Sequence, residues 1–302
     1  AQDRDMFRVN IELPSNASAL TTMNRVIEIR EDILKSGLIS VEKDYSFIGR
    51  MMPRVLMNVV GGEEKQGTNN IAQSVYFATD YYEMIENLPE LSRRLVKNNP
   101  DIIVLVDSFS SGPPVFSDVS YVIFGDDPGL LKSLGEELEL IINNSPDINV
   151  TKSATSDSIT NVEFELNSSN ISLSGQNANY LVNEMFTANN GLIVGTMLDS
   201  NKEIPVRLKG LSNKNNLTGN TGFITIPSQD GFEYFDSFGK STLTNKSSTI
   251  TRLDGQRTND VEGWIWTGTL PSATEEAIKK DVADFESRLP IGYSLKQLGE
   301  AE

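Results

Sequence analysis

The chain of 302 residues contains no cysteine and no histidine. Without histidine it has no imidazole general base and no Ser-His-Asp triad, and without cysteine it has no thiolate nucleophile and no thiolate zinc site. The lack of cysteine suits an oxidising compartment without disulfides and the cytosol equally. We therefore expect no catalytic residue, no metal site and no cofactor.

Basic residues and long apolar runs are also scarce. Lys and Arg number 26 against 42 Asp and Glu, which gives a net charge of -16, and no basic stripe gathers the few cations. Phosphate backbones would be repelled, so nucleic acid is not an expected partner. The longest apolar run, "IIVLV" at residues 102–106, is far short of the roughly 20 residues that span a bilayer. We expect a soluble piece excised from a longer protein.

The first part of the chain alternates between strand and helix patterns. Period-two alternation predicts a strand at residues 5–13, and further strands are predicted at 39–49, 72–79 and 101–109, the last apolar on both faces. Helices are predicted at 14–37, from helical periodicity, and at 86–100. In the first helix we expect Ser15 or Asn16 as the N-cap and Gly37 as the left-handed stop. The stripe predicted to be buried consists of Leu20, Met23, Ile27 and Leu34. The order β-α-β-β-α-β is typical of a ferredoxin-like sheet.

A second unit of the same kind begins after "SSGPPVF". Residues 119–124 predict a strand, Asp127 an N-cap, and Pro128 the first residue of a helix that buries one apolar stripe. This stripe consists of Leu130, Leu131, Leu134, Leu138, Ile141 and Ile142. A strand follows at 148–154, but the remaining strand, helix and strand appear only at 261–270, 271–290 and 292–300. In that late helix the inward residues are predicted to be Ala277, Val282, Phe285 and Leu289.

The α+β fold predicted here has two ferredoxin-like βαββαβ units, the second interrupted by an inserted α+β subdomain. The predicted segments are 1–114 for the first unit, 115–156 and 251–302 for the halves of the second, and 157–250 for the insertion. Within the insertion we expect strands at 161–167, 191–198, 204–210 and 222–238 and a helix at 174–189. Asp230 and Gly231 separate two alternating runs and predict a hairpin turn.

Three segments carry a resemblance to a known family. They are "GPPVFSDVSYVIFGDDPGLLKSLGEEL", "ISLSGQNANYLVNEMFTANNGLIVGTM" and "STITRLDGQRTNDVEGWIW". In this order and spacing they resemble the large second periplasmic loop of resistance-nodulation-division (RND) efflux transporters of the hydrophobe/amphiphile exporter type. The likeness covers nearly all of the chain and coincides with the interrupted second sheet.

The resemblance implies a role and a set of partners. The two sheets would be the pore subdomains of a proton-driven inner-membrane exporter of a Gram-negative bacterium, and the insertion would be half of its docking subdomain. Implied partners are small amphiphilic or hydrophobic substrates, a membrane-fusion adaptor and an outer-membrane channel. The full-length pump would be a homotrimer, whereas we expect this piece alone to be a monomer or a weak oligomer.

The resemblance also implies candidate site residues. The cleft through which substrate enters would lie between the two pore subdomains, and the loop over residues 50–70 would border it. On this basis the substrate-path residues are Phe47, Met51, Met52, Met57, Ile103, Leu105, Asp107 and Phe109, and the docking hairpin is Gln229, Asp230, Gly231 and Phe232. The loop is longer and poorer in Phe and Gly than in drug exporters, which leaves the substrate range open.

Simpler interpretations exist for each of these residues. The methionines suit varied apolar molecules because they are flexible and polarisable, but they would also simply pack beneath a long loop. Ile103 and Leu105 would belong to the core, and Asp107 would end its strand. The "RLDGQR" stretch offers an anion site at first sight, but its Asp254-Gly255 pair is typical of a tight turn with structural arginines.

Other classes of function remain as alternatives. A metal-exporting RND branch uses paired methionines for soft ions, but the positions do not match. A freestanding periplasmic binding or scaffold module would use the two sheets as a platform. An enzyme is a third class, since carboxylates are plentiful although no two stand in a recognisable catalytic setting.

Overall fold

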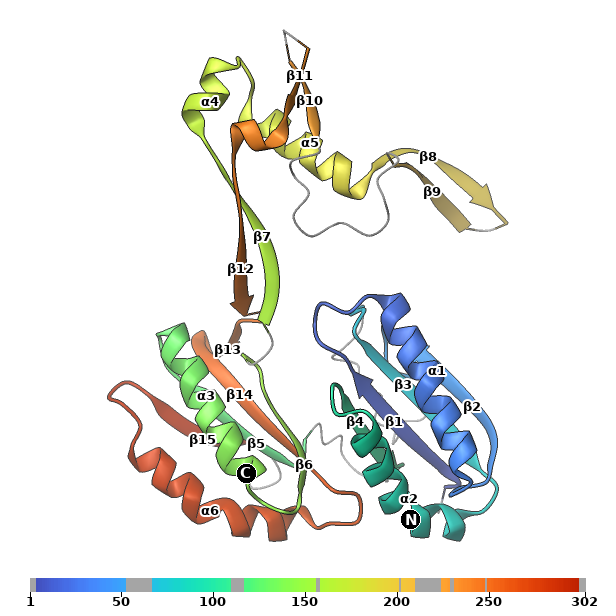
Figure 1. Ribbon diagram of the computed structural model, residues 1–302. Helices are drawn as coiled ribbons and strands as arrows, with labels where there is room; N and C mark the ends of the chain where they lie inside the picture. The colour runs from blue at the N-terminus through green and yellow to red at the C-terminus, as the bar shows by residue number, and fades with distance from the viewer. Residues whose placement is uncertain are drawn as a thin grey trace. The chain divides into compact units, whose positions relative to one another are not determined.

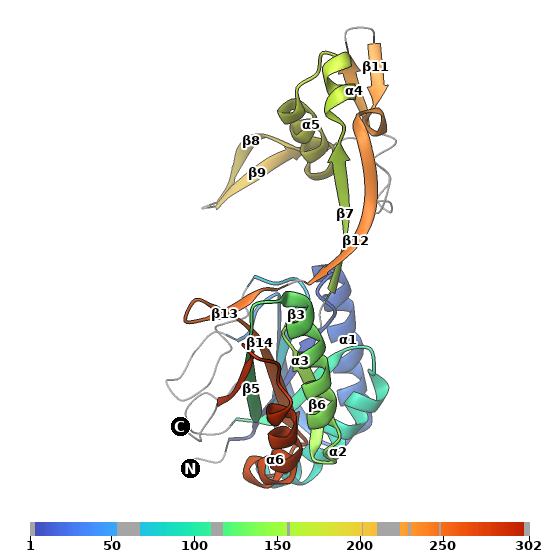
Figure 2. The same ribbon diagram turned by 90° about the vertical axis from the view of Figure 1, so that its left-hand side faces the viewer.

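The computed structural model describes residues 4–52, 67–109, 117–155, 158–200, 202–209, 224–228, 231–247 and 249–298. The chain forms two compact units (Figures 1 and 2). One combines Ala1–Ile159 with Ser247–Glu302, and the other is Thr160–Lys246. The larger unit contains two separate helix-covered sheets, as the sequence predicts.

The first sheet is built from the first 108 residues. Its elements are β1 (Met6–Glu12), α1 (Ala19–Ser36), β2 (Val41–Ile48), β3 (Ile71–Ala78), α2 (Tyr81–Asn98) and β4 (Ile103–Ser108). The strand order is β2-β3-β1-β4 and all pairings are antiparallel. Read from the other edge, the order is fourth, first, third, second, which confirms a split βαβ arrangement. Both helices cover the same face of the sheet (Figure 1).

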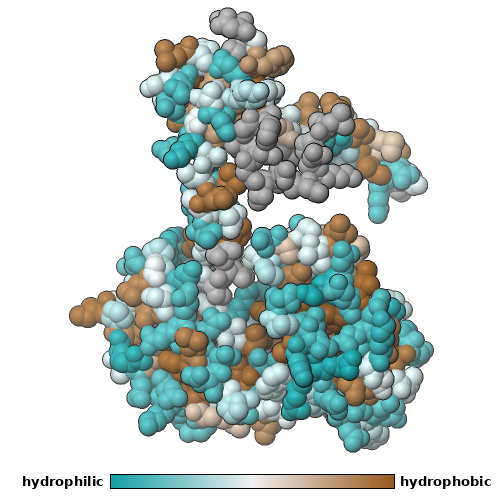
Figure 3. Space-filling view, viewed as in Figure 1, coloured by the Kyte–Doolittle hydropathy of each residue, from teal (hydrophilic) through white to brown (hydrophobic). Residues whose placement is uncertain are grey.

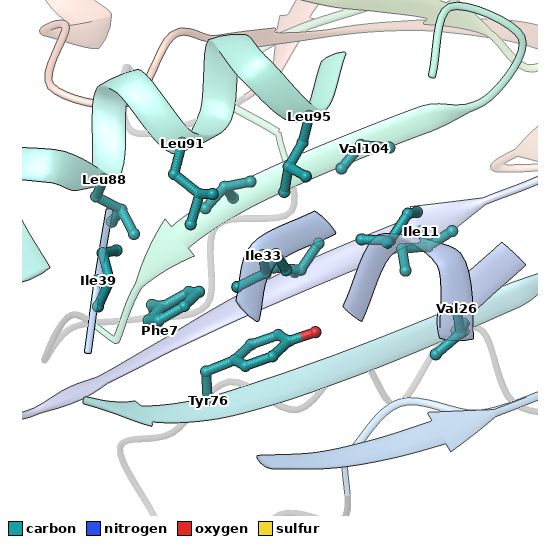
Figure 4. Packing of buried hydrophobic residues seen from close by; sticks show 14 of the residues in the cluster. Phe7, Ile11, Val26, Ile33, Ile39, Tyr76, Leu88, Leu91, Leu95 and Val104 are labelled. Atoms are coloured by element: carbon teal, nitrogen blue, oxygen red, sulfur yellow. The ribbon is translucent and has the colours of Figure 1, made fainter. Parts of the chain in front are cut away.

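Strict alternation along β1 creates the first core. Phe7, Val9 and Ile11 point to the helices, whereas the residues between them stay half-exposed. Phe7 stacks on Tyr76 of β3 with the ring centroids 4.9 Å apart. Leu88, Leu91 and Leu95 close the core from α2 (Figure 4). Because fully buried apolar side chains of this size each contribute about 1.5–3 kcal/mol, this cluster stabilises the first sheet.

The predicted buried stripe of α1 is wrong. Leu20, Met23, Ile27 and Leu34 are 38–61% exposed, and the buried stripe is Thr22, Val26, Ile29 and Ile33. Both rows have helical spacing, so periodicity alone could not choose between them. On the buried face, the Thr22 hydroxyl donates to the Asn69 carbonyl oxygen at 2.7 Å.

The prediction for the start of α1 is wrong, and the prediction for its end is confirmed. Neither Ser15 nor Asn16 is the N-cap; Ser18 is, and its Oγ accepts from the Thr21 N–H at 3.1 Å. Gly37 ends the helix with a φ of 65°, a left-handed conformation that favours glycine, so the predicted stop is confirmed.

The second sheet repeats the first. It consists of β5 (Val119–Phe124), α3 (Pro128–Asn143), β6 (Ile148–Ser153), β14 (Gln256–Ile265), α6 (Pro271–Ser287) and β15 (Ser294–Leu298), in the order β15-β5-β14-β6. Val261 and Gln297 both pair with Tyr121, one from each side. The strand after the insertion therefore completes the sheet begun before it, as predicted. A short strand, β13 (Thr251–Leu253), pairs antiparallel with the first residues of β14.

Most expectations for the helices of the second sheet are confirmed. Asp127 caps α3 by accepting from the Leu130 N–H at 2.7 Å, and Pro128 opens the helix. The buried stripe of α3 matches the prediction except for Leu130, which lies at the surface. In α6 the buried residues are Thr274, Ile278, Val282 and Phe285. Ile278 therefore points inward, where the prediction had Ala277.

A buried polar contact joins the two halves of the interrupted sheet. The Asn259 amide of β14 donates to the Leu131 carbonyl oxygen of α3 at 2.9 Å. Its Oδ1 accepts from the Ser153 hydroxyl at 2.9 Å and from the Thr155 N–H at 3.3 Å. A Cβ at Gly135 would come within 1.9 Å of the Asn259 amide nitrogen, so the helix approaches closely only because residue 135 is glycine. Asn259 thus ties the strand that leaves the sheet to the strand that returns.

The smaller unit has its own core, and its elements follow in chain order. They are β7 (Ser158–Leu166), α4 (Ser168–Leu173), α5 (Ala178–Asn190), β8 (Leu192–Asp199), β9 (Lys202–Leu208), β10 (Thr225–Ser228), β11 (Gly231–Tyr234), η2 (Phe235–Phe238) and β12 (Gly239–Ser247). The core consists of Ile171, Leu181, Ile226, Phe235 and Phe238. Sequence patterns did not predict α4 or β12, and they assigned η2 to a strand.

Two of the predicted unit boundaries, at residues 114–115 and 156–157, lie at positions outside the described residues. The smaller unit ends at Lys246, where the sequence placed the boundary at 250. The division into four segments therefore stays a prediction.

We expect Asn259→Leu to destabilise the second sheet by roughly 3 kcal/mol, because the buried groups that Asn259 pairs would lose their partner. Hydrogen exchange should accelerate in peptides from α3 and β14. Asn24→Leu, at an exposed position of α1, is the matched control and should change stability by less than about 0.5 kcal/mol. Unchanged exchange in α3 would contradict the role given to Asn259.

Candidate functional site

Each sheet of the larger unit has one face covered by helices and one open face. On the first sheet, Val104 and Val106 of β4 point into the core, so their neighbours point the other way. The strand register groups the residues of this first open face. Among them are Arg8, Asn10, Glu12, Tyr45, Phe47, Gln73, Val75, Ile103, Leu105 and Asp107.

The predicted substrate-path residues of β4 lie on the first open face. Ile103 and Leu105 are half-buried and lie outside the core cluster, so the interpretation that they are core residues is wrong. Leu105 and Phe47 share one row of the sheet, through Asn10 and Gln73. Three strand spacings separate them, which is about 14 Å. The two side chains border the same face from opposite edges.

Gln73 is a functional candidate that the sequence analysis missed. Its side chain lies in the middle of the first open face and is buried. It donates to Asn10 Oδ1 at 2.7 Å and accepts from the Met52 N–H at 2.8 Å. This second bond fixes the half-buried Met51-Met52 pair beside the open face. A glutamine within a largely apolar strand was the available signal.

Asp107 stands at the end of the face near the second sheet. The Arg8 Nε lies 3.7 Å from Asp107 Oδ2, and the Arg8 guanidinium lies 5.8 Å from the centre of the Phe109 ring. Loss of hydration raises the pKa of Asp107, while Arg8 lowers it. Because 44% of the Asp107 side chain remains accessible, its pKa rises less than full burial would cause. The group is therefore an ion-paired carboxylate at the rim.

The second sheet has a matching open face. Val119, Tyr121 and Ile123 point to the helices, and so Ser120, Val122 and Phe124 point away. The register adds further members of this second open face, among them Val150, Lys152, Asp260, Glu262, Trp264 and Lys296. Val122 is buried although it belongs to neither helix-covered core, as are Ile71 and Val75 of the first sheet.

Side-chain contacts connect the sheets. The Lys152 ammonium pairs with the Glu12 carboxylate, from one open face to the other. The Thr267 hydroxyl, just after β14, donates to the Val106 carbonyl oxygen of β4 at 2.7 Å. The two open faces therefore approach one another, and the candidate site is the space that they border.

Asp118 lies where the chain enters the second sheet. It accepts from the Ile265 N–H at 3.0 Å through Oδ2. Burial raises its pKa and the like charge of Asp107 adds to the rise, against the lowering by the Ile265 hydrogen bond and by Arg8. Two carboxylates and one guanidinium thus influence each other at this end of the site.

Other predicted residues lie elsewhere or outside the described residues. Phe232 of β11 is 76% exposed, and Gly231 pairs with Ser228 across the hairpin. Gln229, Asp230 and Met57 lie outside the described residues. Asp254 and Gly255 form the predicted tight turn between β13 and β14, with φ values of 52° and 81°. Within the described ranges, no group of three acidic side chains is arranged to hold a metal ion.

The β8–β9 hairpin exposes apolar side chains along its whole length (Figure 3). Leu198 of β8 and Leu208 of β9 are among the most exposed of them. An isolated two-stranded hairpin is marginally stable in water, so this ribbon has the character of a surface that associates. Across the described part of the chain, no helix is both long and apolar enough to cross a membrane.

We expect Asp118→Asn to raise the melting temperature at pH 7. Folding raises the pKa of Asp118, so the ionised form is less favourable in the folded than in the unfolded state. That penalty is present above the raised pKa and disappears as the pH falls through it toward the ordinary value of about 3.9. The gain in melting temperature should therefore shrink by pH 4. A gain that is independent of pH would contradict this account.

This chain is similar to a known protein family and to solved structures. The profile of the AcrB/AcrD/AcrF family matches residues 1–302. No curated protein sequence matches the chain. Among solved structures, a heavy metal efflux pump determined by X-ray crystallography aligns with 99% of this chain at a TM-score of 0.76 and 14% identity. The chain corresponds to 31% of the length of that pump.

The structural likeness at this identity shows the shared fold, and the family profile shows the relationship. Two ferredoxin-like sheets, the second interrupted by an inserted unit, occur here in the order that the resemblance implied. The chain belongs to the AcrB/AcrD/AcrF family of RND efflux transporters.

Proposed function

We propose that this chain is the periplasmic part of a proton-driven RND exporter in the inner membrane of a Gram-negative bacterium. Its two sheets would border the cleft through which small amphiphilic or hydrophobic substrates enter. The observation that carries this proposal is the pair of matching sheets whose open faces approach each other through Glu12 and Lys152. Two independent cores allow each sheet to move as a body.

The chemistry of the first open face suits amphiphiles. Ile103, Leu105 and Phe47 offer apolar surface that is neither fully buried nor fully exposed. Gln73 and Asn10 lie between them and offer amide groups. Binding sites for small molecules combine apolar walls with a few polar groups in this manner.

A metal-exporting role is the second candidate, and the name of the solved pump favours it. Soft ions need thiolate, imidazole or thioether ligands, and this chain offers only its 8 methionines. Met84 is in the first core and Met23 is on the outer surface of α1. Met51 and Met52 are adjacent and half-buried beside the first open face, which makes them the pair to test.

The partners are proposed from the family relationship. A membrane-fusion adaptor, an outer-membrane channel and a homotrimer would complete the pump, with the β10–β11 hairpin and its exposed Phe232 in the docking region. We propose no catalytic role and no cofactor. A gene without membrane helices on either side of this chain would instead favour a freestanding scaffold module, and turnover of a glycan or ester by the purified chain would favour an enzyme.

We expect Leu105→Trp in the full-length transporter to narrow the cleft and reduce export of large amphiphiles. The minimum inhibitory concentrations of detergents and dyes should fall roughly fivefold, the factor that about 1 kcal/mol of lost binding gives. Leu140→Trp, on the exposed surface of α3, is the control and should leave them unchanged. Equal tolerance of both variants would oppose the proposed path.

The double substitution Met51→Leu and Met52→Leu separates amphiphiles from metals. Leucine keeps the apolar volume and removes the thioether sulfur. Tolerance of silver and copper should remain at the wild-type level if amphiphiles are the substrates. A loss of silver tolerance with normal detergent tolerance would establish the metal-exporting alternative.

A further inference from the structure

A pocket lies beside α1, on the first sheet. It has a volume of about 560 Å³, within the range of roughly 300–1,000 Å³ that is usual for small-molecule sites. Its walls come from the end of β1, the loop that follows, one face of α1, and the two residues just before β4. Leu13, Ala17 and Ile102 of these walls pack against the helix-covered core. The pocket is therefore on the helical side of the sheet, away from the first open face.

The apolar wall of the pocket is already ordered. Leu13 is buried in the first core, and Ala17 and Ile102 pack against it. The buried Asn70 fixes the backbone of Leu13 at both its N–H and its C=O, with hydrogen bonds of 2.8 Å and 2.9 Å. The Ala17 N–H donates to the Pro14 carbonyl oxygen at 2.8 Å and closes the turn before the helix. A ligand that binds against this wall loses little affinity to ordering of the protein.

Three charged side chains meet at the same pocket. Arg25 of α1 donates through Nη1 to Glu28 Oε2 at 3.3 Å and through Nη2 to the carboxylate of Asp101. The contact with Asp101 spans 76 positions, so it holds the guanidinium between the helix and the segment before β4. Two carboxylates beside one guanidinium leave an excess of negative charge. The side-chain amides of Asn16 and Asn24 add further acceptor oxygens to the lining.

This excess of negative charge determines which ligands suit the pocket. The chain as a whole carries a net charge of -16, so anions are repelled from its surface. An ammonium group has three donors and no acceptor, and it therefore matches carboxylate and amide oxygens. Because a carboxylate accepts about four hydrogen bonds, Glu28 and Asp101 can bind such a donor while each stays paired with Arg25. A ligand with an ammonium group on an apolar body would use both the charged and the apolar wall.

We infer that this pocket is a second binding site, outside the cleft, for small organic cations. The ammonium group would bind at Glu28 and Asp101, and the apolar body would lie against Leu13 and Ile102. The collection of cationic substrates for export at this site rests on the proposed function, whereas binding itself does not. Both carboxylates are largely exposed, so salt screens the attraction and the affinity is weak.

Fluorine NMR on the purified full-length transporter tests the pocket. This chain has no cysteine, so Asn24→Cys can carry a trifluoromethyl label on the pocket wall once any cysteines elsewhere in the transporter are replaced. We expect 2-phenylethylammonium to shift the label signal in a saturable manner. The alcohol 2-phenylethanol has the same apolar body without the charge, and it should bind roughly fivefold more weakly, the factor that about 1 kcal/mol gives. Added salt should weaken binding of the cation and leave binding of the alcohol unchanged.

Substitutions on the labelled background assign the binding to this pocket. Glu28→Gln and Asp101→Asn each remove the excess negative charge, and each should weaken binding of 2-phenylethylammonium roughly fivefold. Thr21→Trp, at an exposed lining position, should block the pocket while both carboxylates remain. Glu31→Gln is the matched control, because Glu31 lies on the same helix and pairs with Lys35; it should leave binding unchanged. The absence of a saturable shift, or undiminished affinity in both Glu28→Gln and Asp101→Asn, would overturn the inference.

Export measured with the same variants separates this inference from the proposed function. If the label responds to the cation as expected but the transporter exports none of the tested amphiphiles, the proposed function fails and the binding site stands. If amphiphiles are exported while the label never responds, the binding site fails and the proposed function stands.

Discussion

The whole arrangement depends on β14 pairing with β5 on one side and β6 on the other. The smaller unit, Thr160–Lys246, separates β14 from both of these strands in the sequence. The second sheet therefore closes only after the chain has returned from the insertion. Asn259 fixes this return, because it contacts α3 and the end of β6 at once. A buried amide with all of its partners specifies one register where apolar contacts alone would tolerate a slip.

Local patterns predicted most elements, because their causes are local. Alternation in β1 and β5 and the cap at Asp127 depend on a few neighbouring residues. The face of α1 could not be chosen this way, since two apolar rows compete and the packing against β3 decides. The strand β12 was missed because "GKSTLTNKS" lacks an apolar face; it is a strand because β7 supplies its partner.

The candidate site was predictable only in part. Ile103, Leu105 and Asp107 were singled out through the family resemblance, and the structure places them on one face with Phe47. Gln73, Glu12 and Lys152 were not singled out. Their hydrogen bonds join residues that are 21, 63 and 140 positions apart in the sequence. Polar residues that meet across long sequence separations leave no periodic trace. The polar character of the site is thus the part that requires three-dimensional information.

The two-stranded ribbon of β7 and β12 has a consequence for how such proteins diversify. Its strands pair side by side near both ends of the inserted segment, as the bond from Thr160 to Asn245 at 2.9 Å shows. The two ends of the inserted segment are therefore adjacent. A segment with adjacent ends can be exchanged for another of different length during evolution without disturbing either host core.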